Sequence, residues 1–213
     1  MRVDTRRLTD SNPKMSTISV PAVPVPEFPV RPFTVEEYHR LAEAGILTDE
    51  DRVELLEGFV VPKMIHNPPH DTSVKLADEA LRGRLPTGWH TRVQSAVTIG
   101  DSEPEPDVAV VRGSIRDYAV THPGRGDIGL LVEVAESSLA KDRRKRQVYA
   151  RTEIANYWIV DLEDRQVEVY SDPISQEEPS AYKQQTIYRP GESIPLCLDG
   201  QHLGDIPVDD LLP

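Results

Sequence analysis

Carboxylates that suit metal chemistry stand at two apolar runs in the middle of the chain. Asp107 precedes the run Val108–Val111, and Glu133 lies inside a second run at residues 129–135. Short apolar runs of this kind are typical of buried strands. A carboxylate in such a strand is costly to bury unless it is paired or binds a metal. Asp107 and Glu133 are therefore the first candidates for ligands of one hard cation.

A strongly basic stretch follows the second run. Between Lys141 and Arg151 there are six lysines and arginines against Asp142 alone, and we expect a helix here that begins after Ser137 or Ser138. Two carboxylates, a lysine and a basic helix together indicate a metal-dependent nuclease. The same stretch is also typical of a solvated helix face, so both interpretations stay open at this point.

The length and composition of the chain predict one folded domain with a tail. We expect residues 1–31, which are rich in proline, to form an extended or disordered tail, and residues 32–213 to form the domain. The single Cys197 excludes an internal disulfide and a cysteine-rich zinc site. The N-terminus lacks the apolar core of a secretory signal peptide, and no apolar run is long enough to span a membrane. The sequence therefore predicts a cytoplasmic protein without a membrane partner.

The net charge of −12 argues against general nucleic-acid affinity. That objection is limited by screening, because the Debye length is about 8 Å at physiological salt. A local basic patch can therefore outweigh the distant acidic residues.

Capping residues, turn residues and the spacing of apolar residues predict the helices and strands that must position these candidates. Thr34 and Glu37 form a capping box that begins a helix, and residues 52–63 predict a hairpin with its turn at Glu57-Gly58. A second helix follows the loop that contains His70. Strands are predicted at residues 89–99, 107–111, 129–135, 156–160, 167–170, 182–188 and 193–198, with a short helix at 115–120 and a closing element at 208–212.

This order predicts an α/β fold with a mixed sheet. The Glu133 strand, the basic helix and the strand at residues 156–160 form a βαβ crossover, so those two strands are expected to be parallel. The strands at residues 89–99 and 107–111 are expected to be antiparallel neighbours.

Three further residues are weighed as site candidates. Glu54 lies inside the first arm of the hairpin and Glu57 at its turn; acids in turns are usually exposed, so we favour Glu54 for chemistry. His70 fits a residue at a helix start better than a catalytic residue.

Six segments together resemble the Uma-two family of restriction endonucleases, a bacterial group in the PD-(D/E)xK nuclease superfamily. The likeness covers about residues 33 to 213. It is carried by Phe33–Tyr38, Arg52–Gly58, Ser102–Asp107, Val132–Ser138, Asp142–Lys145 with Tyr149-Ala150, and Tyr157–Val160. The resemblance implies a restriction-endonuclease-like fold, with a mixed central sheet flanked by helices. It also implies an endonuclease that cleaves DNA with Mg²⁺, Mn²⁺ being the alternative, and that forms a homodimer.

The resemblance also implies roles for individual residues. Asp107 would be the PD aspartate and Glu133 the second acid, and these two would hold the metal. The motif's lysine position falls on Ala135, which cannot orient or polarise a water. The lysine role would then move to the helix and fall on Lys145, with Lys141 as the alternative.

The remaining roles concern the basic helix and the hairpin. Glu54 would add a fourth catalytic residue. Arg143, Arg144 and Arg146 would contact backbone phosphates, contacts that carry affinity but no sequence information.

Two other functions stay open. A catalytically silent nuclease-fold module that binds nucleic acid or a protein partner is favoured by Ala135 and by the acidic composition. A different metal-dependent hydrolase is the third interpretation, because a fold alone does not fix the substrate.

Overall fold

The computed structural model describes residues 29–176 and 179–213. The tail expected at residues 1–31 therefore falls almost entirely outside the described residues. Residues from Pro32 to Pro213 form one compact unit. Among the described helices, none combines the length and the apolar character that a membrane span requires.

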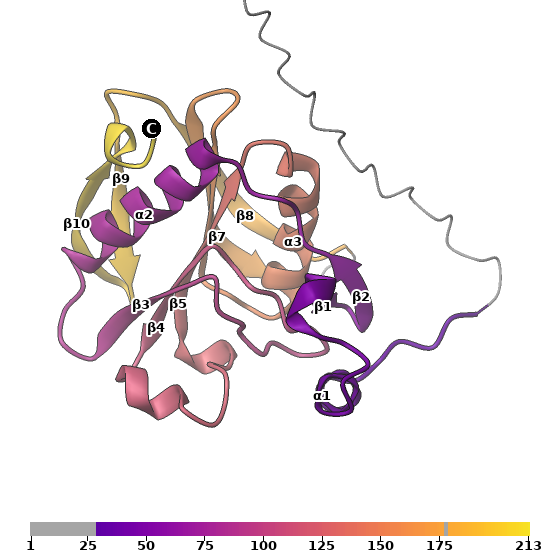
Figure 1. Ribbon diagram of the computed structural model, residues 1–213. Coiled ribbons are helices and arrows are strands. Elements are labelled where there is room, and N and C mark those ends of the chain that lie inside the picture. Colours follow the sequence, from indigo (N-terminus) through magenta and orange to yellow (C-terminus); the bar gives the residue numbers. More distant parts are fainter. Residues whose placement is uncertain (1–28, 177–178) are drawn as a thin grey trace, which may run out of the picture. The chain divides into compact units, whose positions relative to one another are not determined.

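A six-stranded mixed sheet is the centre of this unit (Figure 1). Its spatial order follows the sequence: β3 (Trp89–Val93), β4 (Val108–Arg112), β5 (Ile128–Ala135), β6 (Asn156–Asp161), β7 (Gln166–Ile174) and β8 (Ala181–Tyr188). Only β5 and β6 are parallel, and α3 (Leu139–Arg151) connects them. The other neighbours are antiparallel. The predicted mixed α/β fold, the βαβ unit and the antiparallel pairing of β3 with β4 are all confirmed.

Two hairpins stand apart from the central sheet. β1 (Val53–Leu56) pairs with β2 (Phe59–Pro62), and β9 (Ser193–Leu198) pairs with β10 (Gln201–Pro207). Glu57 and Gly58 both have positive φ, 53° and 77°, as a tight two-residue hairpin turn requires. The first hairpin and its turn were predicted, whereas β10 was not.

Two further helices and four short 3-10 turns complete the unit. α1 (Val35–Glu43) begins at the predicted capping box, in which Thr34 and Glu37 bond each other's backbone N–H. α2 spans Pro68–Arg82, with proline at its start. The 3-10 turns are η1 (Asp49–Asp51), η2 (Ile115–Tyr118), η3 (Arg125–Asp127) and η4 (Val208–Asp210). η2 occupies the place of the short helix expected at residues 115–120.

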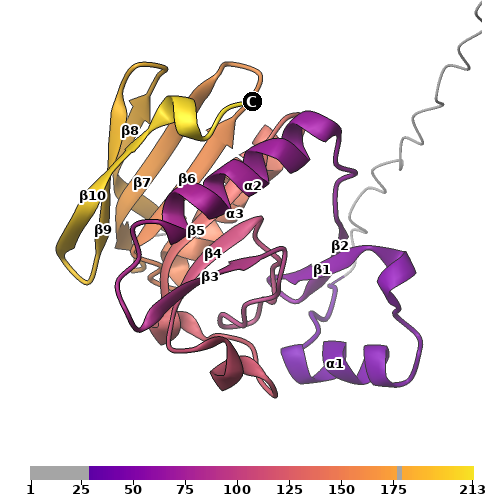
Figure 2. The ribbon, with the colours of Figure 1, turned by 60° about the vertical axis from the view of Figure 1, so that its left-hand side comes forward.

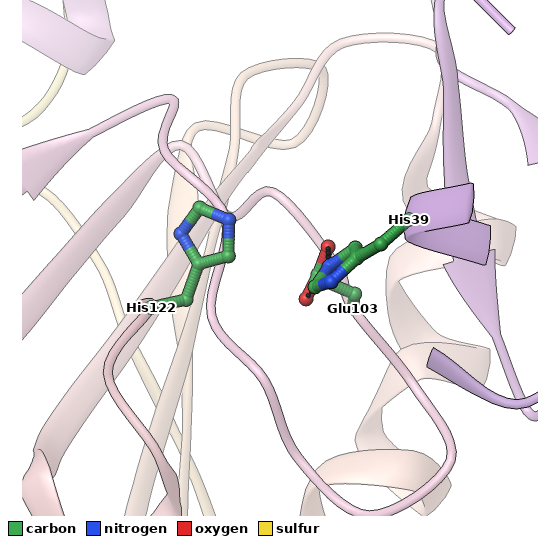
Figure 3. A group of neighbouring side chains, drawn as sticks. All are labelled: His39, Glu103 and His122. Carbon is green, nitrogen blue, oxygen red and sulfur yellow. Dashed lines mark hydrogen bonds and ion pairs between the residues drawn. The ribbon is translucent and has the colours of Figure 1, made fainter. Parts of the chain in front are cut away.

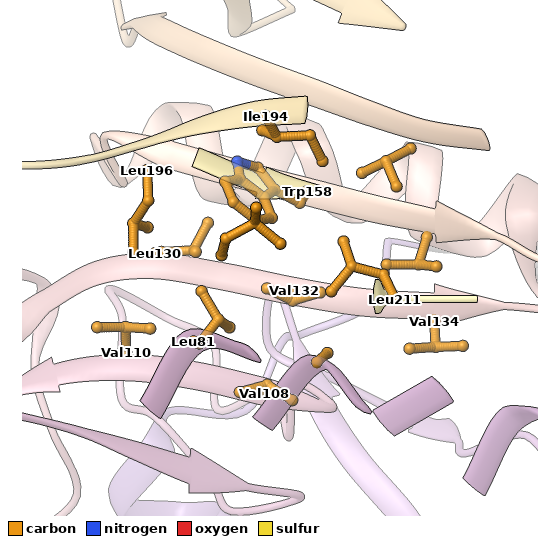
Figure 4. Packing of buried hydrophobic residues seen from close by; sticks show 14 of the residues in the cluster. Leu81, Val108, Val110, Leu130, Val132, Val134, Trp158, Ile194, Leu196 and Leu211 are labelled. Atoms are coloured by element: carbon orange, nitrogen blue, oxygen red, sulfur yellow. The ribbon is translucent and has the colours of Figure 1, made fainter. Parts of the chain in front are cut away.

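The two faces of the sheet are covered by different elements. On one face, α2, the β9–β10 hairpin and the C-terminal residues enclose a cluster that includes Leu81, Val132, Trp158 and Leu196 (Figure 4). On the other face, α3 packs Val148 and Tyr149 onto the sheet. Figure 2 shows α2 lying across the strands beside the β9–β10 hairpin. Alternate residues of β5 enter the two clusters, as the period of a strand requires.

The strand expected at residues 89–99 ends early. β3 stops at Val93, and Gln94 has a left-handed backbone with φ of 43°. The segment beside it contains Pro104 and Pro106, which have no N–H to donate to a ladder. Isolated backbone hydrogen bonds still join the two segments. One runs from the Gln94 N–H to the Asp107 carbonyl and another from the Val97 N–H to the Pro104 carbonyl.

Candidate active site

A cleft of about 360 Å³ collects polar residues from most elements on the α3 side of the sheet. It contains all four residues predicted to be catalytic and both candidate lysines. The side chains that matter here are Glu54, His66, His70, Gln94, Asp107, Glu133, Lys141, Asp142 and Lys145. Several of them are charged and almost completely buried, an arrangement that a purely structural surface rarely needs.

The register of β4 and β5 brings the two candidate metal ligands to adjacent positions. Val108 is the partner of Val132, and Asp107 and Glu133 are the next residue on each side of that pair. Asp107 is 6% exposed and Glu133 4% exposed. The place where β3 separates from β4 is therefore where these two carboxylates enter the cleft.

Asp107 is held by a backbone amide and a histidine. Its Oδ2 accepts hydrogen bonds from the Val134 N–H at 2.8 Å and from His70 Nε2 at 3.2 Å. Burial alone would raise the pKa of Asp107, but the bonds from His70 and Val134 bring it below its usual value. Its Oδ1 has only a long contact, 3.5 Å, with Gln94 Nε2.

Glu133 is also held through one of its two oxygens. Its Oε1 accepts from Lys145 Nζ and from the Tyr149 hydroxyl, both at 2.9 Å. Within the described residues, Oε2 accepts no hydrogen bond. Burial, together with the negative charges of Asp142 and Asp107, raises the pKa of Glu133 to about 8, against the opposing effect of Lys145.

This donor set fits a divalent cation. Glu133 keeps Oε2 without a hydrogen bond in the described residues, and Asp107 Oδ1 has only the weak 3.5 Å contact with Gln94 there, so both oxygens are available to a ligand. Burial is the main cause of the raised pKa of Glu133, so a bound cation would favour the ionised form of this carboxyl. Carboxylate oxygens are the donors that Mg²⁺ prefers. Ligand atoms of His66, His70 and Asp107 also lie within 4.8 Å of one another, which adds nitrogen donors next to the same aspartate.

Lys145 reaches the acids from the buried face of α3. Its Nζ lies 2.9 Å from Glu133 Oε1 and 3.1 Å from Glu54 Oε2, and its side chain is 5% exposed. Burial would lower its pKa, but the charges of Glu133 and Glu54 raise it well above the ordinary lysine value. The raised pKa favours the charged ammonium form of Lys145, as a role in stabilising negative charge requires.

Glu54 and Lys141 form the other side of the cluster. Glu54, 2% exposed, lies in β1 and pairs with Lys141 Nζ at 2.7 Å as well as with Lys145. Lys141 also donates to the Pro62 carbonyl at 2.7 Å, which connects α3 to the first hairpin. Glu57, the alternative to Glu54, instead pairs with Arg151 at 2.8 Å and does not line the cleft.

Sequence reasoning gave His70 too little weight. Its side chain is buried at the first turn of α2 and bonds Asp107, and it stacks on His66 with ring centroids 4.0 Å apart. Burial would lower the pKa of His70, but the bond to Asp107 raises it. The sequence signal was the pair His66 and His70, four residues apart around the start of α2, and this pair becomes informative only once Asp107 is known to lie opposite.

The three arginines expected to contact phosphates do not line the cleft. Arg143 forms an ion pair with the buried carboxylate of Glu168, and the guanidinium of Arg146 lies 5.1 Å from the centroid of the Tyr170 ring. Arg144 is exposed and makes no hydrogen bond or ion pair within the described part of the chain. Of the three, Arg144 is the one whose charge is available to an external ligand.

Comparison with known proteins identifies the family of this chain. The model of the Uma2 family, described as a putative restriction endonuclease, matches residues 35–206. The chain belongs to this family. A search of the curated proteins gave no match.

Among solved structures, a putative nuclease belonging to DUF820 from Anabaena variabilis is similar in fold. The TM-score is 0.63 at 18% sequence identity, and the match covers 84% of this chain and 97% of that chain. The fold is therefore shared across nearly the full length of that nuclease, and the Uma2 match includes every residue that lines the cleft.

Proposed function

We propose that residues 32–213 form a metal-dependent endonuclease that hydrolyses phosphodiester bonds in DNA in the cytoplasm. The single observation that carries the proposal is the cleft, in which Asp107, Glu133 and Lys145 meet although they come from three different elements. Membership of the Uma2 family and the fold of the Anabaena nuclease support it.

In this proposal Asp107 and Glu133 hold Mg²⁺, with Mn²⁺ as a substitute. When bound, the ion would neutralise charge on the phosphoryl group and lower the pKa of a coordinated water. The expected ligands are Oε2 of Glu133 and Oδ1 of Asp107, which would exchange its weak contact with Gln94 for the ion, and His70 orients Asp107 through Oδ2.

Lys145 supplies the fixed positive charge. An ammonium that bonds Glu133 can also donate to a water or to a phosphoryl oxygen held beside that carboxylate, and so stabilise charge that develops during in-line attack. Glu54 keeps the Lys145 ammonium in place from the opposite side. Ala135 is compatible with activity in this arrangement because the lysine arrives from α3 rather than from β5.

Substrate would be held by charge outside the cleft. Arg144 is the expected phosphate contact, and Arg143 and Arg146 contribute long-range charge while they remain bound to Glu168 and Tyr170. Two copies of the chain would place one cleft at each strand of a duplex, so we propose a homodimer as the active form.

The experiment that tests the proposal is a cleavage assay of the purified full chain. Supercoiled plasmid and single-stranded DNA are incubated with Mg²⁺, with Mn²⁺ or with EDTA. We expect nicking or linearisation with either metal and none with EDTA. Cleavage that persists in EDTA would contradict the metal requirement, whereas DNA binding without cleavage under every metal would favour the silent binding module.

A further inference from the structure

Outside the cleft, three side chains from distant parts of the chain converge at the surface (Figure 3). His39 comes from α1, Glu103 from the segment before β4, and His122 from the loop between η2 and η3. One ligand atom from each lies within 4.8 Å of the other two. We propose that His39, Glu103 and His122 form a binding site for a divalent transition-metal ion such as Zn²⁺, which fastens α1 to the body of the domain.

The donor types fit such an ion. Two imidazoles and one carboxylate are typical ligands of zinc and of other first-row divalent metals. With metal–ligand distances of about 2.0–2.1 Å, tetrahedral ligands lie about 3.3 Å apart. His39 Nε2 already lies 2.7 Å and 2.9 Å from the two carboxylate oxygens of Glu103. Around an ion, His39 and Glu103 would separate slightly from this hydrogen-bonded distance, and the His122 nitrogen, which lies within 4.8 Å of both, would approach them.

The carboxylate at the centre is fixed in advance. Glu103 is 4% exposed, and its Oε2 accepts a hydrogen bond from the Thr98 hydroxyl at 2.8 Å. Its backbone N–H donates to the Leu55 carbonyl at 2.7 Å. A ligand carboxylate that is oriented by its own hydrogen bonds is typical of metal sites.

Thr98 also positions the loop that carries His122. Its backbone N–H donates to the Pro123 carbonyl at 2.9 Å, and Thr98 forms an isolated bridge with Gly124. Within the described residues, His122 itself makes no hydrogen bond or ion pair; its nearest ring is that of His39, with centroids 6.3 Å apart. Its nitrogens are therefore available to a ligand.

α1 is the element that would gain most from a metal. None of its residues is buried, and Tyr38 reaches the body of the domain through a long bond, 3.3 Å, from its hydroxyl to the Val53 carbonyl. His39 already contacts Glu103, and a bound ion would strengthen this link and extend it to the loop that carries His122. The Glu103 segment pairs with β1 at Leu55, next to Glu54. The metal-linked residues, which we call the clamp, would therefore also stiffen one wall of the cleft.

The test measures Zn²⁺ binding without nucleic acid, so its outcome is independent of nuclease activity. Isothermal titration compares the metal-free full chain with the variants His39→Ala, His122→Ala and His202→Ala. His202 is the matched control, because it is an exposed histidine bonded to Asp205 on β10. Zn²⁺ that binds at His66, His70 and Asp107 appears equally in all four proteins, so the difference between them reports the proposed site.

We expect His39→Ala and His122→Ala each to lose one equivalent of Zn²⁺, or to bind it at least tenfold more weakly, while His202→Ala matches the wild type. Hydrogen exchange provides the second readout: Zn²⁺ should slow exchange of the α1 amides in the wild type and not in His122→Ala. Wild-type stoichiometry and affinity in both ligand variants would overturn the site, and so would a wild-type chain that binds no Zn²⁺. Unchanged α1 exchange would overturn the clamp.

Discussion

At the scale of single residues, the cleft depends on which oxygen of each carboxylate accepts hydrogen bonds from the protein and which one can bind a metal. Glu133 gives Oε1 to Lys145 and Tyr149, and Asp107 gives Oδ2 to His70 and Val134. Each carboxylate is thereby oriented through one oxygen, while the other has at most the weak contact of Asp107 Oδ1 with Gln94 within the described residues. In this account His70 is a positioning residue, since it acts on the metal through Asp107.

The first prediction concerns that role of His70. His70→Ala should weaken Mn²⁺ binding by about 10–100-fold, because Asp107 loses an orienting partner. His70→Gln, which keeps a donor, should recover part of the affinity. Metal titration followed by the electron paramagnetic resonance of free Mn²⁺ measures both, with His202→Ala as control. If His70→Gln binds as poorly as His70→Ala, the imidazole itself is a metal ligand and the positioning role is wrong.

Several of the residues that line the cleft could be predicted from the sequence. Asp107 and Glu133 stood out because carboxylates at apolar runs are unusual, and Lys145 came from the family resemblance. His70 and Gln94 did not stand out, because their importance depends on which distant segments they meet. Gln94 adopts φ of 43° and contacts His66 at 3.1 Å, a conformation that alternation along a strand cannot show.

At the scale of elements, α3 differs most from what its composition suggests. Most of its residues from Lys141 to Gln147 are charged, yet Asp142 and Lys145 among them are buried with 4% exposure each. Its basic character therefore serves three purposes: Lys141 and Lys145 enter the cleft, Arg143 pairs with β7, and Arg144 faces outward. The hydropathy pattern predicts one charged helix and does not distinguish these roles.

The second prediction separates the structural arginine from the exposed one. Arg143→Ala should lower the free energy of unfolding by about 1–3 kcal/mol, because the completely buried carboxylate of Glu168 loses its ionic partner. The lower part of that range is expected, since the Tyr170 hydroxyl still donates to Glu168. Urea unfolding measures the change, and Arg144→Ala is the matched control that should unfold like the wild type. Equal stability of all three proteins would show that the pair contributes nothing.

The third prediction assigns the phosphate contact to Arg144. Arg144→Ala should weaken DNA binding across all sequences. It should also reduce the slope of log affinity against log salt by about 0.9, the value for one lost phosphate contact. Fluorescence anisotropy over a range of salt concentrations measures the slope. Lys75→Ala, an exposed cation on α2, should leave it unchanged. An unaltered slope in Arg144→Ala would make this part of α3 a solvated face.

The limits of prediction at this scale have a physical origin. The capping box, the first hairpin and the βαβ unit are encoded by local residues, and all three are present. β10 was missed because Ile206 alone among its residues is deeply buried, so it shows no alternating pattern. It becomes a strand only because β9 offers it a partner. The strand expected up to Ile99 ended early because its neighbour contains prolines.

At the scale of the whole molecule, the chain carries 24 basic and 36 acidic residues. Affinity for DNA must therefore come from a local surface rather than from the total charge. One cleft per chain also limits what a single copy can do, because a duplex has two strands to cut.

The fourth prediction is that the protein is a homodimer. Sedimentation equilibrium should give twice the chain mass of 23.9 kDa in the concentration range of the cleavage assay. Cross-linking of the assayed sample provides the check at the same concentration. A monomer throughout that range would contradict this part of the proposal.

The central claim is that Lys145, delivered by α3, completes the site that Asp107 and Glu133 begin. The most direct measurement is the initial rate of plasmid cleavage in Mg²⁺ for the wild type, Lys145→Ala, Lys145→Arg and Lys141→Ala. Lys145→Ala should lower the rate by about 10²–10³-fold or more, as for loss of a charge-stabilising donor, with DNA and metal binding retained. Lys145→Arg should restore it only in part, because a guanidinium is bulkier and differently directed. Lys141→Ala should cost much less, since the partners of Lys141 among the described residues are Glu54 and the Pro62 carbonyl, and neither is Glu133. Wild-type cleavage by Lys145→Ala together with a loss in Lys141→Ala would transfer the role to Lys141 and contradict the account.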